Sequence, residues 1–207
     1  MKTKQLLCSA LICLLGAIRV PAEATTNAVH RSCCQKAEAP AKPLAEKSLY
    51  QLDDSWTNDN GQSMKLGSLH GRPQVVVMFF ANCQYACPLL VYQMQQIEEA
   101  LPASVRTNVG FTLVSFDSKR DTPAALKDYR NLHGFSPANW TLLNGNPDAV
   151  LDLAALLGVQ FKEDAQGNFS HSNVITLLNA DGEIAQQQVG LNTDNHELVA
   201  AIKKLAH

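Results

Sequence analysis

An apolar segment followed at once by two cysteines and a proline constrains this chain more than any other part of its sequence. The segment covers residues 74–81, and the motif Cys83-Gln-Tyr-Ala-Cys87-Pro88 comes directly after it. A run of this kind, without polar alternation, predicts a strand buried on both faces of a sheet. Pro88 predicts a helix start, where the N–H that proline lacks would have no acceptor anyway.

This placement predicts that both sulfurs lie at the carboxyl end of a core strand and at the amino end of a helix. Open α/β sheets bind ligands at that edge, and the helix dipole is expected to lower the pKa of a thiol there. Because thiolate is the form that binds metals and attacks disulfides, we expect the two cysteines to bind a metal ion or to exchange disulfides. A purely structural Cys83–Cys87 disulfide would close too short a loop to stabilise the fold much.

The first 24 residues predict a secretory signal peptide. Lys2 and Lys4 form a charged start, residues 5–18 are mostly apolar, and Ala22-Glu23-Ala24 offers a small-x-small motif for cleavage after Ala24. The apolar stretch is shorter than the roughly 20 residues that a membrane-spanning helix needs. The alternative is that the segment is not cleaved and stays as a membrane anchor. We therefore expect an exported protein, periplasmic or facing the extracytoplasmic side of a membrane.

The length of 207 residues leaves room for one domain with a hydrophobic core. Lys and Arg number 17 against 19 Asp and Glu, and the leader holds three of the basic residues, so the exported part is mildly acidic. That balance excludes the basic surface of a nucleic-acid-binding protein. Residues 25–47, rich in Ala, Lys, Glu and Pro, predict a flexible tether, and the folded domain is expected over residues 48–207.

Alternating strand-like and helix-like segments then predict a mixed central sheet flanked by helices. Thr122 and Asn146, each followed by proline, are typical helix N-caps. The order of the strand-like and helix-like segments is that of an α/β, thioredoxin-like fold with an additional amino-terminal β-hairpin. We expect that hairpin over residues 49–69, strands over 75–80, 109–116, 141–143, 173–178 and 183–189, and helices over 88–101, 123–133, 147–157 and 196–205.

The cysteine spacing exceeds the Cys-x-x-Cys of thioredoxins by one residue, which allows both sulfurs to face a third partner. Two thiolates select soft ions such as Cu(I) or Zn, and a histidine commonly completes such a site. Among the six histidines, His171 is the candidate, because it precedes an apolar strand in a loop expected beside the cysteine loop. His133, followed by glycine, is typical of a helix end.

Two enzymatic functions would use the same cysteines, so whether the protein is an enzyme stays open. A thiol–disulfide oxidoreductase would act through the Cys83/Cys87 pair. Thioredoxin-like reductases carry a cis-proline opposite their cysteines, however, and this chain has no proline after Pro147. A thiol peroxidase would need a Pro-x-x-x-Thr/Ser-x-x-Cys pattern, which precedes neither cysteine.

Four motifs in order give the chain its resemblance to the SCO/SenC family of copper-binding proteins, which help to assemble cytochrome c oxidase. The resemblance covers roughly residues 49–205. It implies that Cys83, Cys87 and His171 bind a copper ion. The protein would deliver this copper to a copper-accepting subunit of a respiratory oxidase or another periplasmic copper protein, or it would keep the cysteines of the oxidase's copper site reduced. The motifs are the cysteine motif, Val114 to Pro123, Trp140 to Phe161, and His171-Ser172 before Asn179-Ala-Asp-Gly182.

The chain departs from that family at its site. Gln84, Tyr85 and Ala86 stand where the family commonly has a proline and an acidic residue, Ser118 replaces a usual proline, and Ser170 replaces a usual aspartate. The lost carboxylates make the site less anionic and remove an expected hydrogen-bond partner of the imidazole.

A second cysteine pair, Cys33-Cys34, follows His30 in the predicted tether. Adjacent cysteines have poor geometry for an internal disulfide. The pair could shuttle copper or electrons to the main site, cross-link two chains, or have no role.

Overall fold

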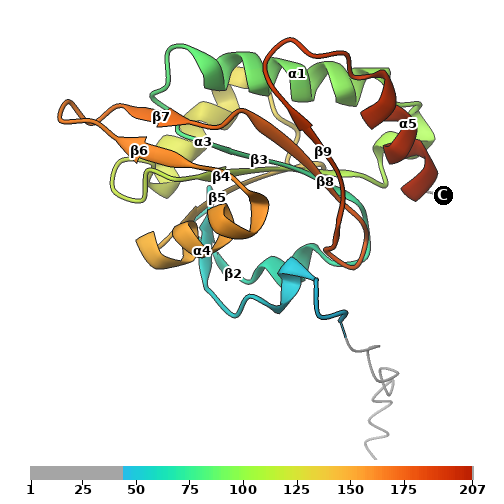
Figure 1. Ribbon diagram of the computed structural model, residues 1–207, viewed down its shortest axis with the longest axis horizontal. Coiled ribbons are helices and arrows are strands. Elements are labelled where there is room, and N and C mark those ends of the chain that lie inside the picture. Colours follow the sequence, from blue (N-terminus) through green and yellow to red (C-terminus); the bar gives the residue numbers. More distant parts are fainter. Residues whose placement is uncertain (1–43, 207) are drawn as a thin grey trace, which may run out of the picture. The chain divides into compact units, whose positions relative to one another are not determined.

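The structure is a computed structural model that describes residues 44–206. Figure 1 shows a central sheet with α1 and α5 over one face and α4 over the other. The strands are β1 (Trp56–Asn58), β2 (Ser63–Met64), β3 (Gln74–Phe79), β4 (Gly110–Ser115), β5 (Trp140–Gly145), β6 (Phe161–Glu163), β7 (Phe169–His171), β8 (Val174–Leu178) and β9 (Ile184–Val189). The helices are α1 (Ala86–Ala100), α2 (Ala103–Arg106), α3 (Pro123–His133), α4 (Pro147–Leu157) and α5 (His196–Leu205), with two short 3-10 helices, η1 (Leu49–Gln51) and η2 (Leu66–Leu69).

Seven strands form one mixed sheet in the order β2-β1-β5-β4-β3-β8-β9. The central strands β3, β4 and β5 are parallel, whereas β8 and β9 on one side and β1 and β2 on the other are antiparallel to their neighbours. The amino-terminal hairpin joins this sheet because β1 pairs with β5, with Trp56 opposite Gly145. The mixed α/β fold predicted from the sequence, including its extra hairpin, is confirmed.

The strand β3 lies in the middle of the sheet, and all six of its residues are buried. It pairs with β4 on one side, where Phe79 is opposite Ser115, and with β8 on the other, where Val75 is opposite Leu177. Because successive side chains of a strand point to opposite faces, both layers of helices need apolar residues here. The continuous apolar run follows from this burial.

The ends of α3 and α4 carry the local signals that the sequence predicts. The Thr122 hydroxyl accepts a hydrogen bond from the Ala125 N–H, and the Asn146 side chain accepts one from the Ala149 N–H. Both helices end at glycines in the left-handed conformation, as at Gly134, with φ 67°. The helix α1 differs, because it begins at Ala86, two residues before the predicted start. Pro88 is then its third residue, where a backbone N–H still has no acceptor within the helix.

Helix α1 is fixed on both sides by side-chain hydrogen bonds. The Gln95 side chain donates to the carbonyl of His133 at the end of α3, at 3.2 Å. The Gln93 side chain donates to Thr193 and Asn195 before α5. These contacts lock the helix that follows the cysteine loop into the layer formed with α3 and α5.

The predicted signal peptide (residues 1–24), its Cys8 and Cys13, and the Cys33-Cys34 pair lie outside the described residues. Most of the predicted tether (residues 25–47) does too, so these segments and the domain boundary at residue 48 stay predictions. Within residues 44–206, no helix is long and apolar enough to cross a membrane.

Candidate metal centre

The cysteine loop begins where β3 ends and closes onto the start of α1. The Cys83 N–H donates to the carbonyl of Phe80 at 3.2 Å, which turns the chain sharply. The Cys87 N–H, in the first turn of α1, then donates to Cys83 Sγ at 3.4 Å. This bond directs one of the unpaired N–H groups of a helix start at the sulfur. Cys83 is half-buried and Cys87 is fully buried.

His171 reaches the cysteines from a second, separate sheet. It is the last residue of β7, which pairs antiparallel with β6 and places His171 opposite Phe161. The imidazole packs against the rings of Phe116 and Phe80, with centroids 5.1 and 6.4 Å away. The prediction of a loop around His171 is therefore wrong, because the residue lies in a short hairpin. Its predicted position beside the cysteines is confirmed, since Cys87 Sγ and His171 Nε2 are 3.3 Å apart.

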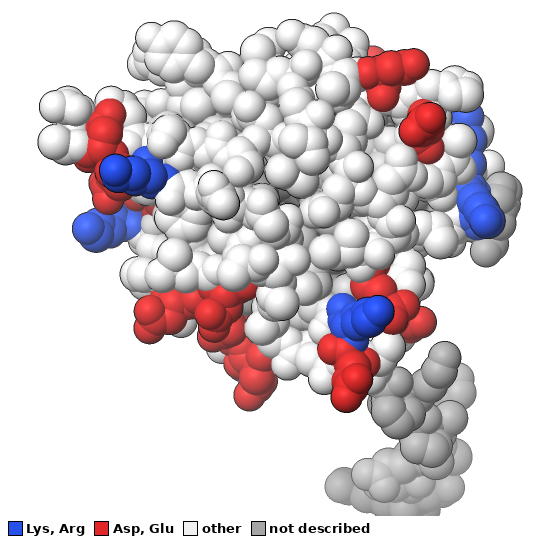
Figure 2. Space-filling model, in the orientation of Figure 1, with Lys and Arg blue, Asp and Glu red and all other residues white. Residues whose placement is uncertain are grey.

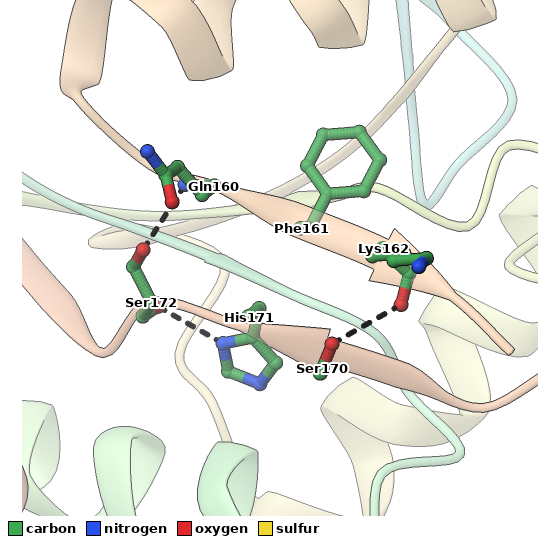
Figure 3. Close-up of a pocket in the computed structure, with 6 residues that line it drawn as sticks. All are labelled: Gln160, Phe161, Lys162, Ser170, His171 and Ser172. Carbon is green, nitrogen blue, oxygen red and sulfur yellow. Dashed lines mark hydrogen bonds between the residues drawn. The ribbon is translucent and has the colours of Figure 1, made fainter.

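The orientation of the imidazole leaves one ring nitrogen, Nε2, available as a ligand for a metal ion. His171 Nδ1 lies 3.0 Å from the carbonyl oxygen of Ser172, as Figure 3 shows. A carbonyl oxygen only accepts, so Nδ1 carries the proton and Nε2 keeps its lone pair in the neutral ring. The sequence predicts that replacing aspartate by Ser170 removes the partner of this imidazole. The Ser172 carbonyl supplies one instead, while the Ser170 hydroxyl faces the carbonyl of Lys162.

Cys83, Cys87 and His171 each offer one ligand atom, and these atoms all lie within 4.8 Å of one another. Sulfur and imidazole ligands of one ion stand at about 2.0–2.3 Å from the metal, so atoms this close can converge on a single ion. The donor set of two sulfurs and one imidazole fits a soft metal. It is the one group of three potential ligand side chains of this kind within residues 44–206.

Burial, rather than the helix dipole, determines the direction in which the pKa of the Cys87 thiol shifts. Burial raises the pKa of Cys87 far above its ordinary value, and the nearby Cys83 and Asp121 add to that rise. The prediction of a lowered pKa is therefore wrong for Cys87. Without a cation this sulfur keeps its proton, and a bound metal ion would offset the cost of burying the thiolate.

Asp121 fixes the first residues of the cysteine loop. Its carboxylate accepts hydrogen bonds from the Ala81 N–H at 2.9 Å and from the Ser115 hydroxyl at 2.5 Å. Burial raises the pKa of Asp121, and these two bonds oppose the rise. Sequence reasoning gave Asp121 no role at the site, although it lies within the motif from Val114 to Pro123.

An open cleft of about 640 Å³ separates the cysteine loop from the β6–β7 hairpin, and a second one of about 420 Å³ lies along the hairpin beside His171 (Figure 3). Tyr85, within the cysteine motif, borders the larger cleft and is 85% exposed. Figure 2 shows charged side chains gathered over the hairpin, whereas the surface over the first half of α1 carries none in that view.

The other described histidines lie outside this cluster. His70 pairs with Asp181, with 3.2 Å between Nε2 and Oδ1. His133 ends α3, as predicted, and packs on the ring of Tyr129 with centroids 4.3 Å apart. His196 is exposed at the start of α5. His30 and His207 lie outside the described residues.

Solved structures with the same fold include several Sco proteins. The chain matches ScoI of Bradyrhizobium japonicum, solved with copper bound, with a TM-score of 0.63 and 24% identity over 73% of this chain and 96% of that one. It matches BsSco, described as a member of the Sco family of cytochrome c oxidase assembly proteins with a disulfide switch, with a TM-score of 0.66 and 20% identity over 80% and 98%. A SCO1/SenC family lipoprotein of Bacillus anthracis matches with a TM-score of 0.68 and 22% identity over 80% and 100%.

The sequence comparisons agree with this fold. A protein of Stutzerimonas stutzeri named as a putative copper-binding protein is 29% identical over 143 residues, which are 67% of this chain and 68% of that protein. The family model described as SCO1/SenC matches residues 43–207. The chain therefore belongs to the SCO1/SenC family.

Proposed function

We propose that this protein binds Cu(I) through Cys83, Cys87 and His171 and carries it to a copper-accepting protein. The observation that supports this most is the ligand set itself, with three donor atoms within 4.8 Å of one another. Two thiolates favour Cu(I) over hard cations. The Ser172 carbonyl fixes the imidazole so that Nε2 points to the sulfurs, an arrangement typical of metal-binding histidines.

The accessibility of the site supports transfer rather than permanent storage. Cys83 is only half-buried and borders the larger cleft, so a partner's thiolate or imidazole can approach it. Copper would then leave by exchange of one ligand at a time. By analogy with BsSco, an oxidase assembly protein, we propose as partner a copper-accepting subunit of a respiratory oxidase or another periplasmic copper protein. The predicted signal peptide would place both on the extracytoplasmic side.

Metal analysis of the reduced protein tests this function. We expect one Cu(I) per chain and copper–sulfur scattering in X-ray absorption. Cys83→Ser and Cys87→Ser should each abolish tight binding, because one sulfur and one imidazole are too few soft ligands. A copper stoichiometry that neither substitution changes would eliminate the proposal.

Thiol–disulfide exchange is the second candidate, and the proximity of the two free thiols favours it. Cys83, the more accessible sulfur, would attack a partner disulfide, and Cys87 would then displace the partner. The cycle would leave a Cys83–Cys87 disulfide and two partner thiols, with two electrons transferred. The two candidates differ in their need for His171.

A further inference from the structure

The hairpin that carries His171 is joined to the main sheet at only one of its ends. β6 and β7 form a two-stranded sheet of their own, without ladder pairing to the seven strands. The end near His171 continues directly into β8, and there Gln160 and Ser172 exchange hydrogen bonds. The turn at residues 164–168 is the free end. Phe161 and Phe169 pack their rings on Phe116, so the position of His171 depends on these contacts and on what holds the turn.

Within residues 44–206, Arg120 supplies the hydrogen bond that joins this turn to the rest of the protein. Its guanidinium donates to the carbonyl of Gly167 and lies over the ring of Phe169, with Cζ 5.6 Å from the ring centroid. Other hydrogen bonds of the turn stay inside the hairpin, such as those from the Gln166 and Asn168 N–H groups to Asp164.

A buried carboxylate fixes Arg120 in turn. Asp117 is only 3% exposed and forms an ion pair with the guanidinium. It also accepts a hydrogen bond from the Arg120 N–H at 3.1 Å, and its own N–H donates to the Ser115 hydroxyl. The path from the end of β4 to the hairpin turn is thus a chain of direct contacts through Asp117, Arg120 and Gly167.

The turn is shaped to receive this side chain. Gly167 has a φ of +80°, and a Cβ at this position would lie 2.7 Å from a guanidinium nitrogen of Arg120. A residue with a side chain would be strained there and would push the arginine away. Glycine therefore permits both the turn and the close approach of Arg120.

We propose that Arg120 is a positioning residue for His171: by holding the free end of the hairpin, it keeps the imidazole beside the two cysteines. The inference rests on the copper site proposed above. Arg120 touches none of the three ligands, so its contribution to copper binding passes through His171. The cysteine pair lies in the loop after β3 and in the first turn of α1, and its hydrogen bonds do not involve Arg120.

A double-mutant cycle tests this path. Arg120→Met keeps the aliphatic stem and removes the guanidinium, and Lys119→Met removes an exposed cation one position away. Each is made with His171 present and in His171→Ala. The Cu(I) dissociation constant is measured by competition with a chromophoric chelator. With His171 present, Arg120→Met should weaken binding about tenfold, as for groups that orient a ligand, whereas in His171→Ala it should have no further effect.

Three further measurements complete the test. In the metal-free protein, Arg120→Met should speed amide hydrogen exchange in residues 161–171, and Lys119→Met should not. Arg120→Lys should restore part of the copper affinity, because an ammonium can reach Asp117 or Gly167 but lacks the planar fork that serves both. Disulfide exchange by the cysteine pair should stay at the wild-type rate in Arg120→Met.

The outcomes separate this inference from the proposed function. Equal losses of affinity with and without His171 would mean general damage and would overturn the positioning role. So would unchanged affinity in Arg120→Met, whether or not its hairpin exchanges faster. If the wild-type protein binds no Cu(I), or binds it equally well in His171→Ala, the proposed ligand set itself fails.

Discussion

His171 Nε2 lies 3.3 Å from Cys87 Sγ, although 84 positions separate the two residues in the chain. Cys87 comes from the start of α1, next to the central sheet, and His171 comes from the separate β6–β7 hairpin. Two elements that share no strand pairing thus bring a soft sulfur and an oriented imidazole together. This convergence has consequences that differ between a metal carrier and a reductase.

His171→Ala separates the two candidate functions. A copper site loses a ligand, so the Cu(I) affinity should fall by a factor of about ten or more. Thiol–disulfide exchange depends on the thiolate fraction and on the leaving group, so reduction of a model disulfide should largely persist. The affinity is measured by chelator competition, with the exposed His196→Ala as the matched control.

The opposite pattern would change the assignment. If copper binding survives in His171→Ala while disulfide exchange collapses, His171 acts as a base for a reductase. The copper-carrier proposal would then be withdrawn.

Tyr129→Phe should not destabilise the protein. The Tyr129 hydroxyl is buried and finds no hydrogen-bond partner among the described residues, so its removal ends the cost of an unpaired polar group. We expect the free energy of unfolding to stay unchanged or to rise by about 1 kcal/mol, as measured by urea denaturation.

Ser115→Ala provides the contrast for Tyr129→Phe, because it also removes one buried hydroxyl. The Ser115 hydroxyl donates to Asp121 and accepts from the Asp117 N–H. Its loss should cost about 1–3 kcal/mol. A Tyr129→Phe variant as unstable as Ser115→Ala would mean that the phenol has a partner that this structure does not contain.

Leu113→Ala should strongly destabilise the fold. Leu113 lies in the middle of β4 and is fully buried, so truncation leaves a cavity in the core. We expect a loss of about 2–5 kcal/mol. Leu132→Ala, at a position on α3 that is 81% exposed, is the matched control and should stay within about 0.5 kcal/mol of the wild type. Similar losses in both variants would contradict the assignment of the core.

His133→Phe should flatten the decline of stability in mild acid. Burial lowers the pKa of His133 below its ordinary value of 6.5, so the unfolded chain takes up a proton more readily than the folded one. The stability from the neutral ring is therefore present above the unfolded pKa and is lost as the pH falls through the folded pKa. Phenylalanine keeps the ring contacts with Tyr129 and Phe135 but cannot titrate.

The measurement for His133→Phe is urea denaturation of both proteins between about pH 8 and pH 5, a range that spans the ordinary histidine titration. At the upper end the imidazole is neutral in both the folded and the unfolded wild type, which makes that point the internal reference. Parallel declines of stability for the two proteins would contradict the role of His133.

The helices α3 and α4, whose bounds the sequence predicts well, carry start and stop signals in their own residues. The bounds of α3 and α4 are as predicted, because a capping side chain and a proline mark each start and a left-handed glycine follows each end. The bounds of α5 are also as predicted. The predicted strand over residues 141–143 is too short, since β5 covers Trp140–Gly145. Asn144 and Gly145 read as loop residues, but pairing with β1 draws them into the sheet.

The parts of the site that the sequence did not predict depend on packing between distant segments. Strands of three residues such as β6 and β7 are too short for a visible alternation. Their placement comes from the ring of Phe116, which stacks on Phe161 and packs against Phe169. The burial of Cys87, which reverses the expected shift of its pKa, likewise depends on the whole core. The role of Arg120 depends on a turn 47 positions away.

The division of the ligands between two sheets gives a bound ion a second effect in polymer terms. An ion held by both Cys87 and His171 is a cross-link that closes a loop of more than 80 residues. Such a closure restricts the unfolded chain, and it also couples metal binding to the docking of the hairpin. Under the proposed function, the ion therefore adds to the contacts of Phe116 and Arg120 that already hold the hairpin. Release of the cargo then also removes one constraint on the eleven residues from Phe161 to His171.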